Sequence, residues 1–71
     1  MADYYLNQNK QANGDYEVHL STCSFLPDQS NREYLGAFDH CWQAVSEAKR
    51  RHPTWHRING CYYCIPSCHT T

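Results

Sequence analysis

The chain has 71 residues, a formal net charge of −1 with neutral histidines, and 41% hydrophobic residues. This length gives a single domain, residues 1–71, which buries only about 60% of its unfolded surface and needs a further source of stability. The near-neutral charge excludes bulk electrostatic attraction to nucleic acid, and no apolar stretch is long enough to span a membrane.

The first half of the chain predicts three short strands. Residues 3–7 form the first, and Asn13-Gly14 predicts a turn before the second. Apolar and polar residues alternate over residues 16–20, which is the period of a half-buried strand. After a polar loop, residues 32–38 predict a third strand. We expect these strands to form an antiparallel sheet.

A helix is predicted after the third strand. Asp39 is a favourable N-cap, and Pro53 ends the helix because the residue before a proline is pushed out of helical geometry. Cys41 lies on the predicted buried face of this helix, where a small core hydrophobe is expected. Residues 54–60 predict a loop.

Two pairs of soft metal ligands stand in distant parts of the chain. His19 and Cys23 are separated by three residues, and Cys61 and Cys64 are separated by two. Zn²⁺ prefers four such ligands in a tetrahedron, and a two-residue gap lets one tight turn, a knuckle, aim both sulfurs at the ion. Gly60 suits this turn because glycine tolerates unusual backbone dihedrals. The sequence predicts that these four residues bind Zn²⁺.

Together these elements predict a small α+β domain. A three-stranded antiparallel sheet carries one helix, and a zinc knuckle completes the order β-β-β-α-knuckle. Four protein ligands leave no position open for water, which is typical of zinc sites that stabilise a fold. The sequence shows no nucleophile–base pair, paired carboxylates or glycine-rich phosphate loop, so we do not expect an enzyme.

The five cysteines allow a second chemistry, disulfide bonding. Disulfides need an oxidising compartment, whereas the start of the chain lacks the apolar stretch and cleavage site of a secretory signal. An odd cysteine count also leaves one thiol over. Both observations favour metal binding in a reducing, cytoplasmic setting, with disulfides and free redox-active thiols as the alternatives.

A rival ligand lies close to the second pair. Cys68 follows Cys64 with ligand spacing, so Cys68 in place of His19 gives an all-cysteine set, and the adjacent His69 is a further substitute. Strict alternation along residues 16–20 places His19 on the face opposite Val18, which favours the rival. The preference of small structural zinc sites for mixed nitrogen and sulfur ligands favours His19.

The ligand pairs belong to a longer pattern over residues 18–66. Its residues are His19-x3-Cys23, Pro27, residues 31–38, Ala44, Ala48 and Cys61-x2-Cys64-x-Pro66. With this pattern the chain resembles the zinc-binding module of the Ada-type bacterial DNA repair proteins and related modules at the ends of some bacterial nucleases. Residues 4–7 and 59–64 also resemble segments of short uncharacterised bacterial proteins. The resemblance implies the same zinc site.

One departure from this pattern limits what the resemblance implies. In the repair proteins, a zinc-bound cysteine at the first ligand position accepts a methyl group from a DNA phosphotriester. His19 occupies that position here, and an imidazole is not a comparable nucleophile. The resemblance therefore implies the zinc site and not the repair activity.

The remaining candidates for function are a cluster of cations and several aromatic residues. Cations at the end of a helix are typical of a solvated helix end, with a phosphate-binding surface as the alternative. Tyr62 and Tyr63 lie within the knuckle and cannot both point inward, so one exposed ring is expected there. Its two possible roles are to stack, together with Trp55, on a base or a partner side chain, or to shield the zinc from water. We expect a structural zinc module that binds a protein partner, or else a nucleic-acid-associated module; a thiol-redox protein is the third candidate. The nucleic-acid alternative uses Lys49, Arg50, Arg51, Arg57 and Trp55.

Overall fold

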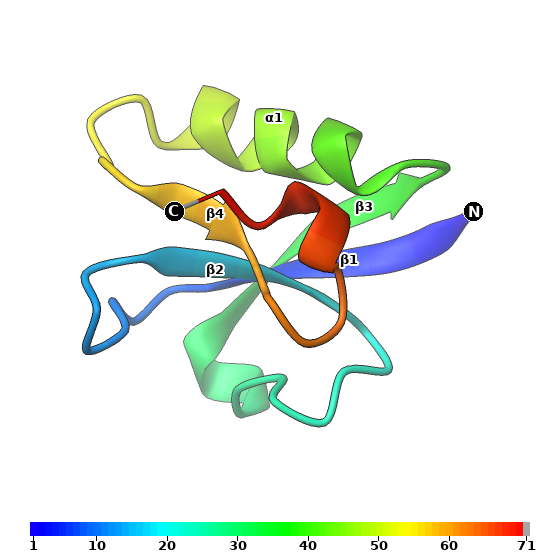
Figure 1. Cartoon of the computed structure of the whole chain (residues 1–71), viewed down its shortest axis with the longest axis horizontal. Helices are drawn as coiled ribbons and strands as arrows, with labels where there is room; N and C mark the ends of the chain where they lie inside the picture. The colour runs from blue at the N-terminus through cyan, green and yellow to red at the C-terminus, as the bar shows by residue number, and fades with distance from the viewer. Residues whose placement is uncertain (71) are drawn as a thin grey trace.

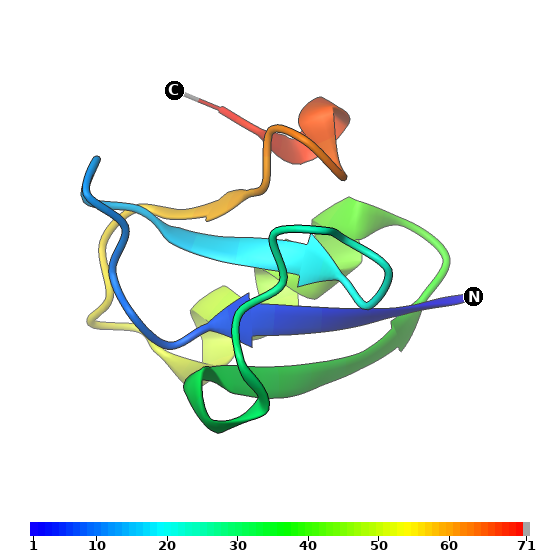
Figure 2. The same cartoon turned by 90° about the horizontal axis from the view of Figure 1, so that it is seen from below.

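The computed structural model describes residues 1–70, and its backbone is a four-stranded sheet with one helix (Figure 1). The strands lie side by side in the order β3-β1-β2-β4 (Figure 2). The elements are β1 (Ala2–Asn7), β2 (Tyr16–Leu20), the 3-10 turn η1 (Gln29–Asn31), β3 (Arg32–Phe38), α1 (Cys41–Arg51), β4 (Ile58–Gly60) and the 3-10 turn η2 (Pro66–Cys68).

The small α+β class is confirmed, but the prediction of a three-stranded antiparallel sheet is wrong. Strands β1, β2 and β3 pair antiparallel as predicted, whereas β4 adds a fourth strand parallel to β2. Ile58–Gly60 lies in the segment for which the sequence predicts a loop. Three residues are too few to show a period, and their pairing depends on a partner strand far away in the chain.

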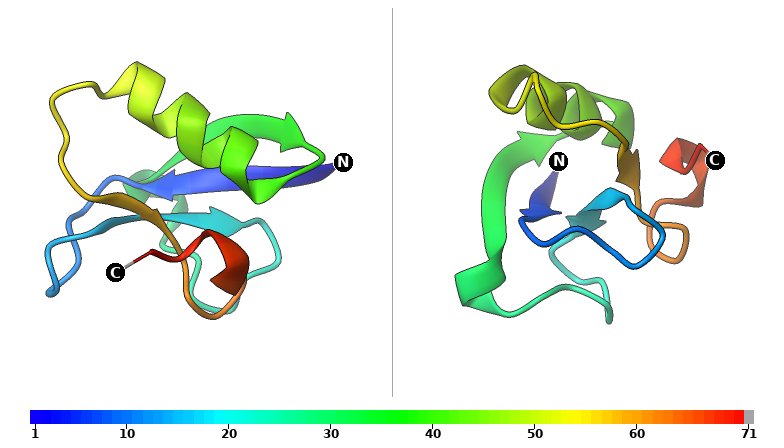
Figure 3. Two further views of the ribbon diagram at one scale, coloured as in Figure 1. Left: turned by 45° about the horizontal axis from the view of Figure 1, so that its top comes forward. Right: turned by 90° about the vertical axis from the view of Figure 1, so that its left-hand side faces the viewer.

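One face of the sheet is covered by α1, and the chain between β2 and β3 passes under the other face (Figure 3). Ala44 and Ala48 are fully buried, so the helix approaches the sheet closely. The hydrophobic core lies between these layers and holds Tyr4, Leu6, Val18, Leu35, Ala44, Ala48, Ile58, Cys61 and Ile65. Residues from four strands and the helix therefore share one core, despite the small number of aliphatic side chains.

The start of α1 differs from the prediction, and its end agrees. His40, and not Asp39, is the N-cap, and its backbone N–H donates to the Gln43 side chain at 3.0 Å. That bond satisfies a backbone donor at the helix start. At the other end, the His52 N–H donates to the Ala48 carbonyl, and the helix ends before Pro53 as predicted.

A disulfide joins the start of α1 to the C-terminal turn η2. Cys41 and Cys68 are 27 residues apart in sequence, and their Cα atoms are 6.3 Å apart. Cys41 is half-buried and covalently bonded, so its prediction as a plain core hydrophobe is wrong. From the sequence we expect either zinc binding or disulfide bonding of the cysteines. The structure instead contains one disulfide and three free cysteines, Cys23, Cys61 and Cys64.

The helices of residues 1–70 include none with the length and apolar character needed to cross a membrane.

Removing the disulfide is expected to destabilise the fold without changing its topology. The Cys41→Ser/Cys68→Ser variant should lose roughly 2–4 kcal/mol of unfolding free energy. The reason is that the bond closes a loop between residues 27 positions apart and so restricts the unfolded chain. Urea titration followed by circular dichroism measures this loss. A mild reductant should destabilise the wild type and leave the double variant unchanged. Equal stabilities in both proteins under oxidising conditions would contradict the account.

Candidate metal centre

The parallel pairing of β2 with β4 brings the two ligand pairs together. Val18 of β2 lies opposite Gly60 of β4, and the N–H of Cys61 donates to the Val18 carbonyl at 2.9 Å. The next residue on β2 is His19, so the register sets His19 beside Cys61. A turn closed by the Cys23 N–H and the Leu20 carbonyl, 3.0 Å apart, then carries Cys23 back toward the same point.

The four predicted ligands form one cluster. The donor atoms of His19, Cys23, Cys61 and Cys64 all lie within 4.8 Å of one another, close enough to hold one metal ion. The Sγ atoms of Cys23 and Cys61 are 3.9 Å apart. Two thiolates bound to one tetrahedral Zn²⁺ at about 2.3 Å stand ~3.8 Å apart, so this spacing fits a shared zinc ion.

The His19 imidazole is the most informative member of the cluster. Its residue is fully buried, and neither ring nitrogen has a hydrogen-bond partner among residues 1–70. Buried polar side chains nearly always have such a partner, and leaving one unpaired costs about 1–3 kcal/mol. A metal ion bound to one ring nitrogen accounts for half of this deficit. The carboxylate of Glu17 lies 3.7 Å from Nε2, beyond hydrogen-bond distance.

Burial shifts the pKa values of three of these residues, His19, Cys61 and Cys64, toward their uncharged forms. Burial lowers the pKa of His19 to about 4, so the imidazole is neutral at pH 7, which is the form that binds metal. Burial also raises the pKa of Cys61, and it raises the pKa of Cys64 to about 12. These thiols ionise only with a compensating charge nearby. The N–H of Leu20 points at the Cys64 sulfur from 3.4 Å and stabilises its thiolate.

The rival ligands lie outside this cluster. The sulfur of Cys68 is bonded to Cys41. The Nδ1 atom of His69 is 3.0 Å from the carbonyl oxygen of Gly60, and its ring meets Tyr62 edge to face. Cys68 therefore joins the C-terminal turn to α1, and His69 packs against β4 and the knuckle.

Gly60 is required for a different reason from the one that the sequence indicates. Its φ is not positive; only Gly14 and Gly36 among the described glycines have positive φ. A Cβ at residue 60 would lie 2.8 Å from the backbone oxygen of Cys68. The missing side chain thus lets η2 pack directly on β4, which places Cys64 beside β2.

Asn59 is an organising residue that the sequence does not reveal. Its side chain is buried; Oδ1 accepts the Thr70 N–H, and Nδ2 donates to the Thr70 carbonyl, both at 2.8 Å. The amide thus pairs with Thr70 as a neighbouring strand would, and fixes the tail after the knuckle. Read in the sequence, Asn59-Gly60 is a turn signal, so only the fold reveals this role.

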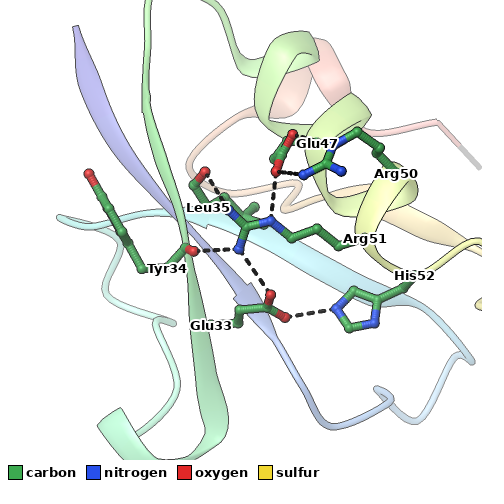
Figure 4. Close-up of polar contacts among 7 residues, drawn as sticks. All are labelled: Glu33, Tyr34, Leu35, Glu47, Arg50, Arg51 and His52. Carbon is green, nitrogen blue, oxygen red and sulfur yellow. Dashed lines mark hydrogen bonds and ion pairs between the residues drawn. The ribbon is translucent and has the colours of Figure 1, made fainter.

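The cations at the end of α1 are mostly paired with carboxylates (Figure 4). Glu47 accepts hydrogen bonds from Arg50 and Arg51, at 2.7 Å in each case. Arg51 also bonds Glu33 and the carbonyls of β3, and His52 lies 2.7 Å from Glu33. This network fastens the end of α1 to β3, so its arginines serve the fold.

Arg57 and Trp55, the other members of the predicted nucleic-acid surface, are also engaged. Arg57 donates from Nε to the buried carboxylate of Asp15 at 2.8 Å. The Trp55 ring is nearly parallel to Tyr16 at 4.1 Å and to His52 at 3.8 Å. Two rings cannot lie this close above one face, so both faces of Trp55 are covered. Lys49 takes part in none of the ion pairs formed by residues 1–70.

Comparisons of the chain with protein-family models, with curated proteins and with solved structures give no match. The function is therefore argued from the geometry of the cluster and its surroundings.

The Gly60→Ala substitution is expected to destabilise the chain by about 1–3 kcal/mol, because a methyl group there forces η2 away from β4. Thermal unfolding of the variant and of the wild type measures this loss of stability. Ser24→Ala, at an exposed position, is the control and should unfold like the wild type. A Gly60→Ala protein as stable as the wild type would show that η2 does not pack on β4 as described.

The network in Figure 4 predicts a pH dependence of stability. Hydrogen bonds from Arg50 and Arg51 lower the pKa of Glu47 to about 2. Burial alone would raise the pKa of Glu33, but hydrogen bonds from His52 and Arg51 outweigh it, and that pKa is also lowered. A lowered folded-state pKa contributes stability above the unfolded value of 4.5, and the contribution disappears as the pH falls toward 2.

The stability difference between wild type and Glu47→Gln should accordingly be constant above pH 4.5 and shrink toward zero near pH 2. Because the ion pairs are near the surface, added salt should reduce this difference. Chemical unfolding at several pH values measures it, with Asp28→Asn as the control, since Asp28 is exposed and outside the ion pairs of the described residues. A difference that grows on acidification would contradict the account.

Proposed function

We propose that this chain is a structural zinc module. His19, Cys23, Cys61 and Cys64 hold one Zn²⁺ ion, which joins the turn after β2 to the knuckle after β4. Two ligands are fully buried and two are half-buried. The four donors complete a tetrahedron and leave no coordination position for water or substrate, so the ion serves to stabilise the fold.

The observation that carries this proposal is the buried His19 ring among three thiols, with both nitrogens unpartnered among the described residues. Alone, three nearby cysteines would also fit a redox group. A buried neutral imidazole has no part in disulfide chemistry, whereas it is a standard zinc ligand. The mixed nitrogen and sulfur set is therefore better explained by a metal ion than by thiol chemistry.

The ligand pattern also supports the resemblance to the Ada-type zinc module. Within that resemblance, His19 at the first ligand position excludes a methyl-accepting cysteine there. The proposed role is accordingly structural, and the surface of the module makes the functional contacts.

A protein partner is a better candidate for those contacts than a nucleic acid. Arg50, Arg51 and Arg57 are paired with carboxylates, and both faces of Trp55 are covered. A phosphate-binding surface needs free cations, and a base-stacking platform needs an open ring face. If the alternative holds, binding to oligonucleotides will be detected at low salt and will fall steeply as salt rises.

A thiol-redox role is also less well supported. Redox-active cysteines have a lowered thiol pKa and are partly exposed. Burial instead raises the pKa of Cys61 and Cys64. Cys41 and Cys68 are already joined and stabilise the attachment of the C-terminal turn.

Zinc content and folding should change together. Native mass spectrometry is expected to find one Zn²⁺ per chain, and strong chelation should unfold the domain, because the binding free energy of a structural zinc is folding free energy. Circular dichroism measures the second effect. A native-like spectrum after complete metal removal would contradict a structural role.

Single substitutions separate the proposed ligands from the rival. His19→Ala should weaken zinc binding by more than about 100-fold, since loss of an outer hydrogen-bond partner alone costs about 10–100-fold. Cys68→Ser is the matched control, because it breaks the disulfide and should keep one zinc per chain. Loss of zinc in Cys68→Ser, together with full zinc in His19→Ala, would show that the rival set is correct.

A further inference from the structure

The Cys41–Cys68 disulfide anchors the same turn that presents one of the proposed zinc ligands. Cys64 precedes Cys68 with three residues between them, and η2 begins within that interval. Cys68 also packs directly on Gly60, the residue before the proposed ligand Cys61. The bond to α1 therefore holds the segment that follows Cys64 in place on β4.

The disulfide is accessible to a small thiol. Cys41 and Cys68 are both half-buried, and together with Cys64 they line a cavity of about 440 Å³. Trp42 and Ser67, which also line this cavity, are exposed to solvent. A thiol that enters the cavity meets the disulfide beside the metal cluster.

The two sulfurs of the disulfide have different surroundings. Cys41 is the first residue of α1, where backbone N–H groups without a partner in the helix stabilise a negative charge. The Ser67 hydroxyl lies 3.6 Å from the Cys41 sulfur and is the donor, because a disulfide sulfur carries no proton. Both interactions stabilise a thiolate at Cys41, so Cys41 is the better leaving group and Cys68 is the sulfur that an incoming thiol attacks.

The disulfide and the metal cluster need opposite redox conditions. Cys23, Cys61 and Cys64 are free thiols, and cysteine binds Zn²⁺ only as a reduced thiolate. Cys41 and Cys68 are joined only when they are oxidised. A medium that keeps the cluster thiols reduced also drives the disulfide toward reduction. The state of this bond therefore follows the redox conditions under which the cluster binds metal.

We propose that the Cys41–Cys68 disulfide is a redox switch that sets the zinc affinity of the cluster. A first thiol attacks the Cys68 sulfur as a thiolate, the S–S bond breaks, and Cys41 leaves as a thiolate and takes up a proton. A second thiol attacks the reductant's sulfur in the resulting mixed disulfide and releases Cys68. Two thiols thus give two electrons and two protons to the cystine and become one disulfide. The inference rests on the proposed function, because it describes the regulation of the same zinc site.

The direction and size of the effect follow from the coupling of folding to metal binding. The disulfide favours the folded over the unfolded chain by roughly 30- to 700-fold. A structural zinc binds the folded chain, so reduction should weaken zinc binding by at least about tenfold and at most by this factor. Structural zinc sites bind tightly enough for the reduced chain to keep its ion until a competitor removes it. Because linkage is reciprocal, bound zinc must oppose reduction by the same factor.

Competition with a zinc-chelating dye tests the switch. The zinc-loaded full chain is compared with its disulfide closed and with its disulfide opened by a phosphine that is then removed under exclusion of air. Transfer of zinc to the dye should be at least about tenfold more favourable from the open chain. Cys41→Ser/Cys68→Ser is the matched control, which should equal the open wild type and should not change on phosphine treatment.

Equilibration with graded mixtures of reduced and oxidised glutathione measures the reciprocal effect in the wild type alone. Alkylation followed by peptide mapping gives the fraction of chains in which Cys41 and Cys68 are free thiols. Saturating zinc should move the midpoint of reduction by about 30 mV toward more reducing conditions for each tenfold difference in zinc affinity.

The outcomes keep the two proposals separate. Equal zinc affinities of the open and closed chains would overturn the switch and leave the zinc module intact. A bond that a large excess of reduced glutathione leaves closed, with and without zinc, would do the same. A closed chain that binds no zinc would overturn the proposed function itself, and the switch with it.

Discussion

His19 and Cys61 lie side by side because β2 and β4 run parallel, and the arrangement of the C-terminal half of the chain depends on this pairing. One strand ends in a turn that returns Cys23, and the other ends in the knuckle that presents Cys64. A one-residue slip would turn His19 to the other face of the sheet and dismantle the cluster. The short parallel ladder therefore sets the geometry of the candidate metal centre.

The C-terminal segment is held to the rest of the fold by three different kinds of interaction. The proposed metal ion joins the knuckle to β2, and the disulfide joins η2 to α1. The Asn59 side chain makes two hydrogen bonds with the backbone of Thr70. A chain this short buries a limited apolar core, so the disulfide, and the coordinate bonds of the proposed metal ion, would supply stability that burial alone does not. The exposed rings of Tyr62 and Tyr63 in the knuckle are positioned by this rigid attachment.

Much of this arrangement follows from local sequence, and the rest depends on distant contacts. Three strands were recognised from local sequence, by the alternation of apolar and polar residues or by composition. The structure contains strands at all three places, residues 3–7, 16–20 and 32–38. The ligand spacings identified the four residues of the cluster, because spacing within each pair is a local property. Strand β4 and the Cys41–Cys68 disulfide were missed, because each is defined only by a partner far away in the chain.

X-ray absorption at the zinc edge of the purified full chain tests the central claim most directly, because it reports the atoms bound to the metal. Coordination by His19, Cys23, Cys61 and Cys64 predicts three sulfur neighbours at about 2.3 Å and one nitrogen at about 2.0 Å. The nitrogen shell should carry the multiple-scattering signature of an imidazole and disappear in His19→Cys. Four sulfur neighbours in the wild type, or a first shell without sulfur, would contradict the account.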